Sequence, residues 1–327
     1  MGSTKEKLLR TLDILNETDE NHPITTAGII ERLNLMGLEP ERKSVQRDIA
    51  LLKHCGYDIV LADDNKQGFY MASRKFDDWE IKVLIDAVES FTFINDKDSD
   101  ALIEKLCSLT SASTGDMFEE MVFPTSGKII SNQVKYAIDT IVTCIRKGKK
   151  VKFEYVYMTP FGETVPKFET DTKPVSPYSL IIKDGEYYLI GNYDANRLSY
   201  YHLDRVRNIE ETDEPIRPLR DILGNSARSK LRTFVYENIY AKKGEEVRIH
   251  LGLKRNAYEA VLETLGNDRV TFIPESDGTI SANVNVADSD GLYRWLMLNS
   301  DKFYVLGPES VKNELVRRLE EMLGQYK

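Results

Sequence analysis

Two short aromatic runs carry the side chains best suited to bind a ligand. Tyr187-Tyr188 follows the turn signal Asp184-Gly185, and Tyr200-Tyr201-His202 precedes Asp204-Arg205. Arginine binds phosphate oxygens in a bidentate manner, and tyrosine and histidine rings offer faces on which nucleobases stack. These residue types therefore predict a site for a nucleotide or for single-stranded nucleic acid.

The predicted effector site draws its residues from several strands. We assign to it Lys149, Lys150, Tyr155, Ser176, Tyr178, Tyr188, Arg197, Tyr201, His202 and Arg205. Because His202 and Arg205 lie three positions apart, strict strand alternation would point them to opposite faces. Both reach one ligand if the strand bends or ends near Asp204, which predicts a site at the rim of the domain. The alternative is that the tyrosines fill a core and Arg205 pairs with Asp204 or Glu210, while Lys149 and Lys150 belong to a solvated loop.

Short strands must position these residues. Val151, Phe153, Tyr155 and Tyr157 alternate along one segment, and residues 173–180, 187–190 and 200–209 supply further strands. Several short strands so close together indicate a small β-barrel.

Three motifs in these strands resemble the WYL domain family. Tyr187-Tyr188-Leu189 corresponds to its Trp-Tyr-Leu triplet, Asp204-Arg205-Val206 to its closing Asp-Arg-Ile, and Pro177-Tyr178-Ser179-Leu180 to its Pro-x-x-Leu. The resemblance implies a barrel of Sm or SH3 type over residues 136–212 that binds a nucleotide or nucleic-acid effector. Family members often carry arginine where this chain has His202 and Ser199, so this site is expected to be less cationic.

Residues 1–75 contain three amphipathic segments followed by two β runs. In the third segment Val45, Ile49 and Leu52 form one buried stripe, and cationic residues face the opposite side. The order predicts a winged helix-turn-helix, and Ser44–Ile49 resembles the recognition helix of DeoR-like regulators. The predicted DNA contacts are Arg42, Lys43, Ser44, Gln46, Arg47 and Lys66. The alternative is an amphipathic helix in a protein-interaction module.

The remaining segments read as connectors and a C-terminal domain. Residues 76–135 are expected to form a helical linker in which Trp79, Val83 and Val88 pack inward, and residues 213–245 a polar linker. Residues 246–327 predict the order βαββαβα, a ferredoxin-like arrangement. Trp295-Leu296 and Phe303–Glu309 resemble the C-terminal extension that accompanies WYL domains.

Composition restricts the remaining classes of function. The net charge of −9 and pI of about 5.2 argue against wrapping nucleic acid over the whole surface, although a local basic patch remains compatible. Three distant cysteines and four scattered histidines form no disulfide framework or metal motif, and we expect no cofactor. The chain lacks phosphate-loop and hydrolase motifs, so we expect that it is not an enzyme. It also lacks a membrane-spanning apolar run and an apolar signal region, so a cytoplasmic location is expected.

These observations favour an α+β multidomain, ligand-responsive transcriptional regulator. It is expected to bind a double-stranded DNA operator as a homodimer, because two half-sites multiply a weak affinity. The main alternative is an accessory protein that binds RNA or single-stranded DNA without operator-specific regulation. An enzyme acting on nucleotides is the weaker alternative, since no pair of base and nucleophile is visible.

Overall fold

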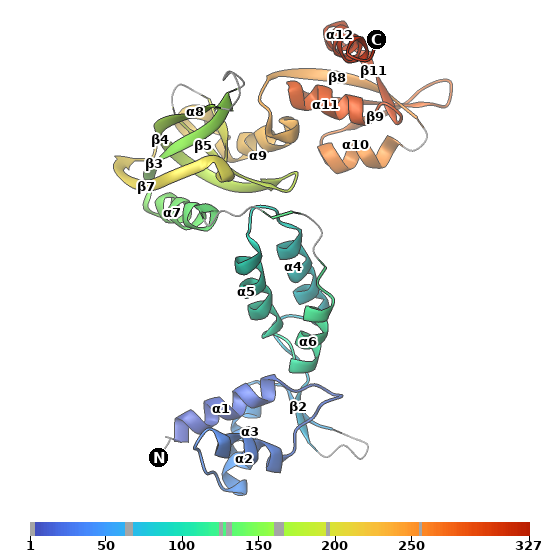
Figure 1. Cartoon of the computed structure of the whole chain (residues 1–327). Helices are drawn as coiled ribbons and strands as arrows, with labels where there is room; N and C mark the ends of the chain where they lie inside the picture. The colour runs from blue at the N-terminus through green and yellow to red at the C-terminus, as the bar shows by residue number, and fades with distance from the viewer. Residues whose placement is uncertain are drawn as a thin grey trace. The chain divides into compact units, whose positions relative to one another are not determined.

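The computed structural model describes residues 4–62, 68–123, 127–128, 133–159, 167–193, 197–254 and 257–327, with the side chains of 157–159, 167–171 and 173 excepted. It contains several sheets and many helices, and it divides into two compact units, Met1–Asn132 and Gln133–Lys327 (Figure 1). Each unit is described by itself. Lys66, one of the predicted DNA contacts, lies outside the described residues.

The first unit begins with three helices and a hairpin. Helices α1 (Thr4–Asn16), α2 (Thr26–Leu35) and α3 (Arg42–His54) precede strands β1 (Ile59–Leu61) and β2 (Phe69–Met71). The Thr25 side chain caps α2 by accepting a hydrogen bond from the Gly28 N–H, as a polar residue before a helix should. Their common core consists of Ile14, Leu15, Ile29, Leu33, Leu38, Val45, Ile49, Leu52, Ile59 and Met71. The predicted buried stripe of α3 is therefore confirmed.

Three further helices complete this unit: α4 (Asp78–Ser90), α5 (Asp96–Cys107) and α6 (Ala112–Glu120). Ile81 and Ile85 face the core of this group. The expectation that Trp79 and Val83 pack inward is wrong, because their exposed fractions are 65% and 58%. Helix α6 was not predicted, since its sequence is polar. Ser111 starts it by accepting a hydrogen bond from the Thr114 N–H.

The second unit opens with a helix and a five-stranded antiparallel sheet. Helix α7 (Gln133–Lys147) packs on strands β3 (Lys149–Thr159), β4 (Lys167–Lys183) and β7 (Val206–Pro215). The sheet order is β6-β5-β4-β3-β7, with β5 at Glu186–Asn192 and β6 at Ser199–His202. Strands β6 and β7 are the two edges, yet only the 3₁₀ helix η1 (Leu203–Arg205) joins them. The sheet must therefore curl until its edges approach. Figure 1 shows the curved strands β3, β4, β5 and β7 of this sheet.

The segment after β7 is not an extended linker. It forms α8 (Arg220–Leu223), α9 (Ala227–Glu237) and the 3₁₀ turn η2 (Ile239–Ala241). Within α9, the Phe234 ring stacks on Tyr200 of β6 with ring centroids 4.8 Å apart. The prediction of a polar linker over 213–245 therefore missed a helix that covers part of the curled sheet.

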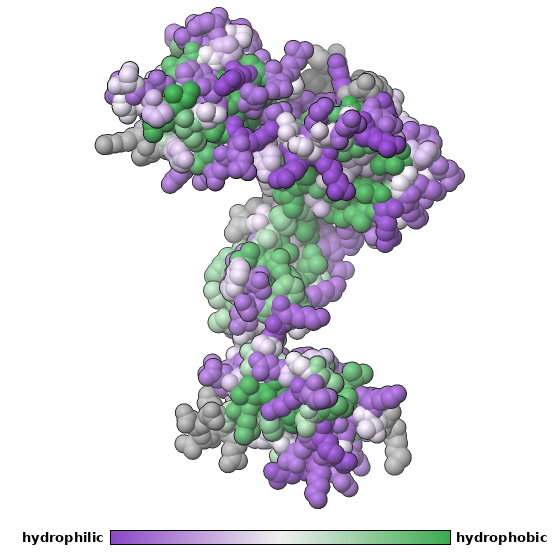
Figure 2. Space-filling view, turned by 180° about the vertical axis from the view of Figure 1, so that it is seen from behind, coloured by the Kyte–Doolittle hydropathy of each residue, from purple (hydrophilic) through white to green (hydrophobic). Residues whose placement is uncertain are grey.

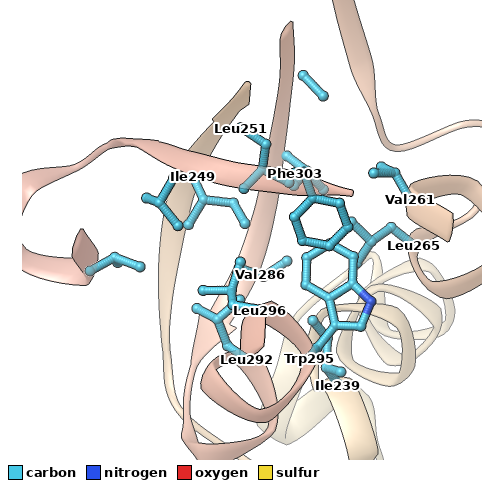
Figure 3. Close-up of a cluster of buried hydrophobic side chains, with 14 of the residues drawn as sticks. Ile239, Ile249, Leu251, Val261, Leu265, Val286, Leu292, Trp295, Leu296 and Phe303 are labelled. Atoms are coloured by element: carbon cyan, nitrogen blue, oxygen red, sulfur yellow. The ribbon is translucent and has the colours of Figure 1, made fainter. Parts of the chain in front are cut away.

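The C-terminal part has the predicted order of elements. It comprises β8 (Glu245–Leu253), α10 (Ala257–Leu265), β9 (Thr271–Pro274), β10 (Ile280–Asp288), α11 (Asp290–Leu298), β11 (Phe303–Gly307) and α12 (Glu309–Gly324). The sheet order is β11-β8-β10-β9, and all pairs are antiparallel. Its core gathers around Trp295 and Phe303, whose ring centroids lie 4.5 Å apart (Figure 3). No helix in the described part of the chain is long and apolar enough to cross a membrane.

Candidate nucleic-acid and effector sites

The 3₁₀ helix η1 decides where His202 and Arg205 lie. Strand β6 ends at His202, and the fully buried Leu203 anchors the turn that follows. The structure therefore fulfils the condition set by the sequence, namely that the strand should end near Asp204. Around this turn it gathers Tyr155 of β3, Tyr188 of β5, His202 and Arg205.

Short contacts define the surroundings of His202. Its ring centroid lies 4.2 Å from that of Tyr188, the residue opposite it in the β5–β6 register. Its Nδ1 atom lies 3.1 Å from Asp204 Oδ1 and 3.8 Å from Glu186 Oε2. The His202 backbone N–H donates to the Tyr155 hydroxyl at 3.2 Å. His202 thus sits among two carboxylates and two phenols.

Burial and neighbouring charges perturb the titration of this cluster. Burial would raise the pKa of the Asp204 carboxyl, but the close His202 ring and the charges of Arg205 and Arg207 hold that pKa below its ordinary value. Burial raises the pKa of Tyr188 to about 12 and also raises the pKa of Tyr155. Asp204 is therefore an anion at neutral pH, and both phenols are neutral hydrogen-bonding groups.

The charges of the cluster nearly cancel. Two carboxylates, Glu186 and Asp204, stand against two guanidinium groups, Arg205 and Arg207. Arg207 donates to backbone carbonyls of Asp204 and Val206, whereas Arg205 is exposed and interacts with the Tyr155 hydroxyl. Arg205 is consequently the cation best placed to meet an anionic ligand. Sequence reasoning missed Glu186, although it shares a strand face with Tyr188 two positions away.

The tyrosines of the cluster differ in how far their rings are available. Only 6% of Tyr188 is exposed, since its ring lies between those of His202 and Tyr200. Tyr201 meets the rings of Phe153 and Tyr155 edge to face, at centroid distances of 5.3 and 5.6 Å. Tyr188 therefore fills the core side of the cluster, and a nucleobase cannot stack on it without displacing a neighbour.

The hydroxyl groups of Ser176 and Tyr178 bind the backbone of Arg217 and do not face the cluster. The Ser176 hydroxyl accepts a hydrogen bond from the Arg217 N–H at 3.0 Å, and the Tyr178 hydroxyl donates to the Arg217 carbonyl at 2.7 Å. Ser176 is also almost completely buried. Their hydroxyl groups fasten the segment that follows β7, so the structure does not bring them to His202.

The predicted cations Lys149, Lys150 and Arg197 also lie away from His202. Lys149 is six residues before Tyr155 on β3, about 20 Å at strand geometry. Arg197 lies in the β5–β6 loop, at the end of the hairpin opposite to the Tyr188–His202 pair. The lysines are paired across the β3–β7 ladder, Lys149 with Glu211 and Asp213, and Lys150 with Glu214.

Helix α3 presents a second candidate surface. Asp48, the only carboxylate in this helix, is buried and lies 2.8 Å from the buried Lys7 ammonium of α1. Lys7 also donates to the Ser44 hydroxyl, so Ser44 is engaged within the fold. The outward side chains of α3 comprise Arg42, Lys43, Gln46, Arg47 and Ala50, all exposed. Five of the six predicted DNA contacts thus belong to this helix, and Ser44 is the least accessible of them.

Comparison with known protein families identifies two domains in the second unit. Residues 136–211 match the model described as WYL domain, and residues 245–323 match that described as WCX domain. The chain contains a WYL domain and a WCX domain. The resemblance read from Tyr187-Tyr188-Leu189 and Asp204-Arg205-Val206 is thereby confirmed, and the curled sheet with its His202–Arg205 cluster belongs to the WYL domain.

Solved structures that resemble the chain include the following two. One is proteasome accessory factor B/C (PafBC) of Arthrobacter aurescens, at 18% identity and a TM-score of 0.32, covering 99% of this chain and 49% of that protein. The chain thus spans about half the length of that protein. The other is described as a CRISPR Cas-related protein, at 11% identity and a TM-score of 0.39, covering 100% of this chain and 87% of the other. No curated protein matches the chain.

Proposed function

We propose that the chain is a transcriptional regulator in which residues 1–75 form a winged helix-turn-helix that binds double-stranded DNA. In this proposal the WYL domain is a small barrel of Sm or SH3 type that senses a nucleotide or single-stranded nucleic acid. The observation that carries the DNA-binding role is the exposed face of α3. Within α3 the one carboxylate, Asp48, is neutralised by Lys7, so Arg42, Lys43 and Arg47 face outward without an opposing charge from the helix itself.

Arg205 supports the sensing role. It is exposed on a 3₁₀ turn whose position Leu203 fixes, and it interacts with the Tyr155 hydroxyl, which also accepts a hydrogen bond from the His202 N–H. A phosphate can bridge a guanidinium and a phenol, while the imidazole offers a hydrogen bond or a ring face to a base. Because the carboxylates of Glu186 and Asp204 oppose the guanidinium groups, we expect a ligand with few phosphates to bind better than a triphosphate.

Homodimer formation is the third part of the proposal. A single winged helix binds weakly, and two copies can engage two half-sites. The exposed side chains of Trp79, Val83 and Leu84 on α4 suit such a contact. Figure 2 shows apolar surface gathered over the α4–α6 helices.

The experiment that tests the DNA-binding role is selection of bound duplexes from fragmented genomic DNA, followed by affinity measurements over a range of salt concentrations. Arg47→Ala should lower the salt slope by about one unit if Arg47 meets a phosphate, or relax specificity at one position if it meets a base. Arg10→Ala, an exposed arginine of α1, is the matched control and should bind as the parent does. If Lys43→Ala and Arg47→Ala both leave binding unchanged, α3 is not the reader. Binding of single strands without any duplex binding would favour the accessory-protein alternative.

A further inference from the structure

The WCX sheet has an outer face that its helices do not cover. Along β8, Ile249 and Leu251 point into the core beneath α10 and α11, so the alternating residues Arg248 and His250 point to the other side. The same alternation on β10 turns Asn283 outward and Val284 inward. A sheet with one packed and one solvated face is common among antiparallel folds, but here the outer face has a specific composition.

The ring of Tyr304 lies over Gly252 on this outer face. It stands opposite Gly252 in the β11–β8 register, and 54% of it is exposed. A Cβ atom built at Gly252 would come within 2.5 Å of the Tyr304 ring, so only glycine leaves space for the ring there. The ring therefore rests against the sheet backbone and offers an aromatic surface to solvent.

Beside the ring, polar side chains form a row across three strands. His250 of β8 is opposite Asn283 of β10, which is opposite Thr271 of β9. The next pair along, Arg248 and Asn285, borders a cavity of about 290 Å³. That cavity is lined by Glu237, Arg248, Arg269, Thr271, Asn283, Val284 and Asn285.

Several groups on this face have free hydrogen-bonding capacity or charge. His250 Nε2 is buried and has no hydrogen-bond partner among the described residues. No carboxylate of the described chain pairs with Arg248, because Glu246 accepts from Asn285 at 2.7 Å and Glu237 lies 3.4 Å from Arg269. The face therefore combines the Arg248 guanidinium, which has no ion-pair partner among the described residues, with amide groups and one aromatic surface, beside the carboxylates of Glu237 and Glu246.

We propose that this outer face of the WCX sheet is a second nucleic-acid site, which binds a single strand of RNA or DNA. One base stacks on Tyr304, the edge of the next base meets Asn283 and Thr271 at the cavity, and Arg248 meets a backbone phosphate. Two residues along a strand advance about 7 Å, which separates the Tyr304 position from the His250 row and leaves room for two unstacked bases. Sheets with exposed aromatic side chains recognise single strands in this manner. The site is separate from the His202–Arg205 cluster and does not rest on duplex binding.

The test uses the full chain carrying Arg205→Ala, so that the WYL cluster contributes little. The probes are fluorescein-labelled ten-nucleotide oligouridylate and oligothymidylate. Tyr304→Ala should weaken binding about tenfold or more, and Tyr304→Phe should bind as the Arg205→Ala chain does, because stacking needs only the ring. Gly252→Val should also weaken binding, since its side chain displaces the ring. Tyr326→Ala, an exposed tyrosine at the end of the chain, is the matched control.

Photo-cross-linking supplies a readout that affinity and folding do not confound. An oligouridylate carrying 5-iodouridine should cross-link within residues 303–307. The proposal is overturned if neither probe binds at micromolar concentration, if Tyr304→Ala binds as the Arg205→Ala chain does, or if cross-links fall only outside that segment. None of these outcomes depends on whether α3 binds duplex DNA, so this proposal and the DNA-binding proposal can fail independently.

Discussion

The buried ion pair beneath α3 should determine whether this helix can present its cations. Lys7 Nζ lies 2.8 Å from Asp48 Oδ2, and each side chain is only 10% exposed. Solvent screening is therefore weak, and removing one partner leaves a buried charge unpaired. We expect Lys7→Met to cost the N-terminal module about 3–5 kcal/mol, a large part of the 5–15 kcal/mol typical of a domain. The exposed pair Arg10–Asp13 is the control, and Arg10→Met should cost below about 1 kcal/mol.

Hydrogen exchange read by mass spectrometry suits this prediction, because it reports on α3 locally in a chain with several domains. Peptides from residues 42–54 should lose protection in Lys7→Met and regain most of it in the double variant Lys7→Met/Asp48→Leu, which buries no charge. A double-mutant cycle then gives the coupling between the two residues. Should the two single changes prove additive, or should Lys7→Met retain the protection of the parent, the pair does not support α3 and our account of its free cationic face fails.

Three further results are expected. Arg205→Ala should weaken binding of a short single-stranded oligonucleotide to the WYL domain about tenfold in calorimetry, while duplex binding stays near the parent value; equal affinity would misplace the effector site. Burial lowers the pKa of Lys183 to about 8 from 10.5. Between these two pH values the unfolded chain binds the proton more readily than the folded one, so the free energy of unfolding should rise with pH. The difference in urea-unfolding free energy between the parent and Lys183→Met should show that rise. Light scattering should find a homodimer at micromolar concentration, and Trp79→Glu together with Val83→Glu should shift it toward monomer.

Much of the fold follows from local patterns. Alternation along β10 and the turn before it located a strand, and the stripe of Val45, Ile49 and Leu52 located the inner face of α3. Helices α6 and α9 were missed because few of their side chains are apolar, and α9 has no buried residue at all. The exposure of Trp79 was missed because residue type alone does not tell which face of a helix finds a partner.

The WYL cluster was predictable only where one strand or one turn decides the geometry. His202 and Arg205 both reach the Tyr155 hydroxyl because β6 ends at His202 and η1 follows, and an Asp-Arg pair after an aromatic run suggested that end. Ser176 and Tyr178 were assigned to the ligand, but their hydroxyl groups bind the backbone of Arg217, about forty residues further along the chain. Such long-range pairing leaves no mark in the local sequence.

Two basic segments show why charge along the sequence is a poor guide to nucleic-acid contact. The run 146–152 has more cations than α3, yet β7 places carboxylates opposite it, and Lys147 bonds Glu211 from 64 positions away. Helix α3 contains an acid of its own, but Asp48 is turned inward to Lys7. The sheet thus neutralises residues 146–152, the segment with more cations, whereas the cations of α3 face no carboxylate of their own helix. A chain of net charge −9 can therefore carry a cationic surface for DNA, and that surface is expected on α3 and not at the start of β3.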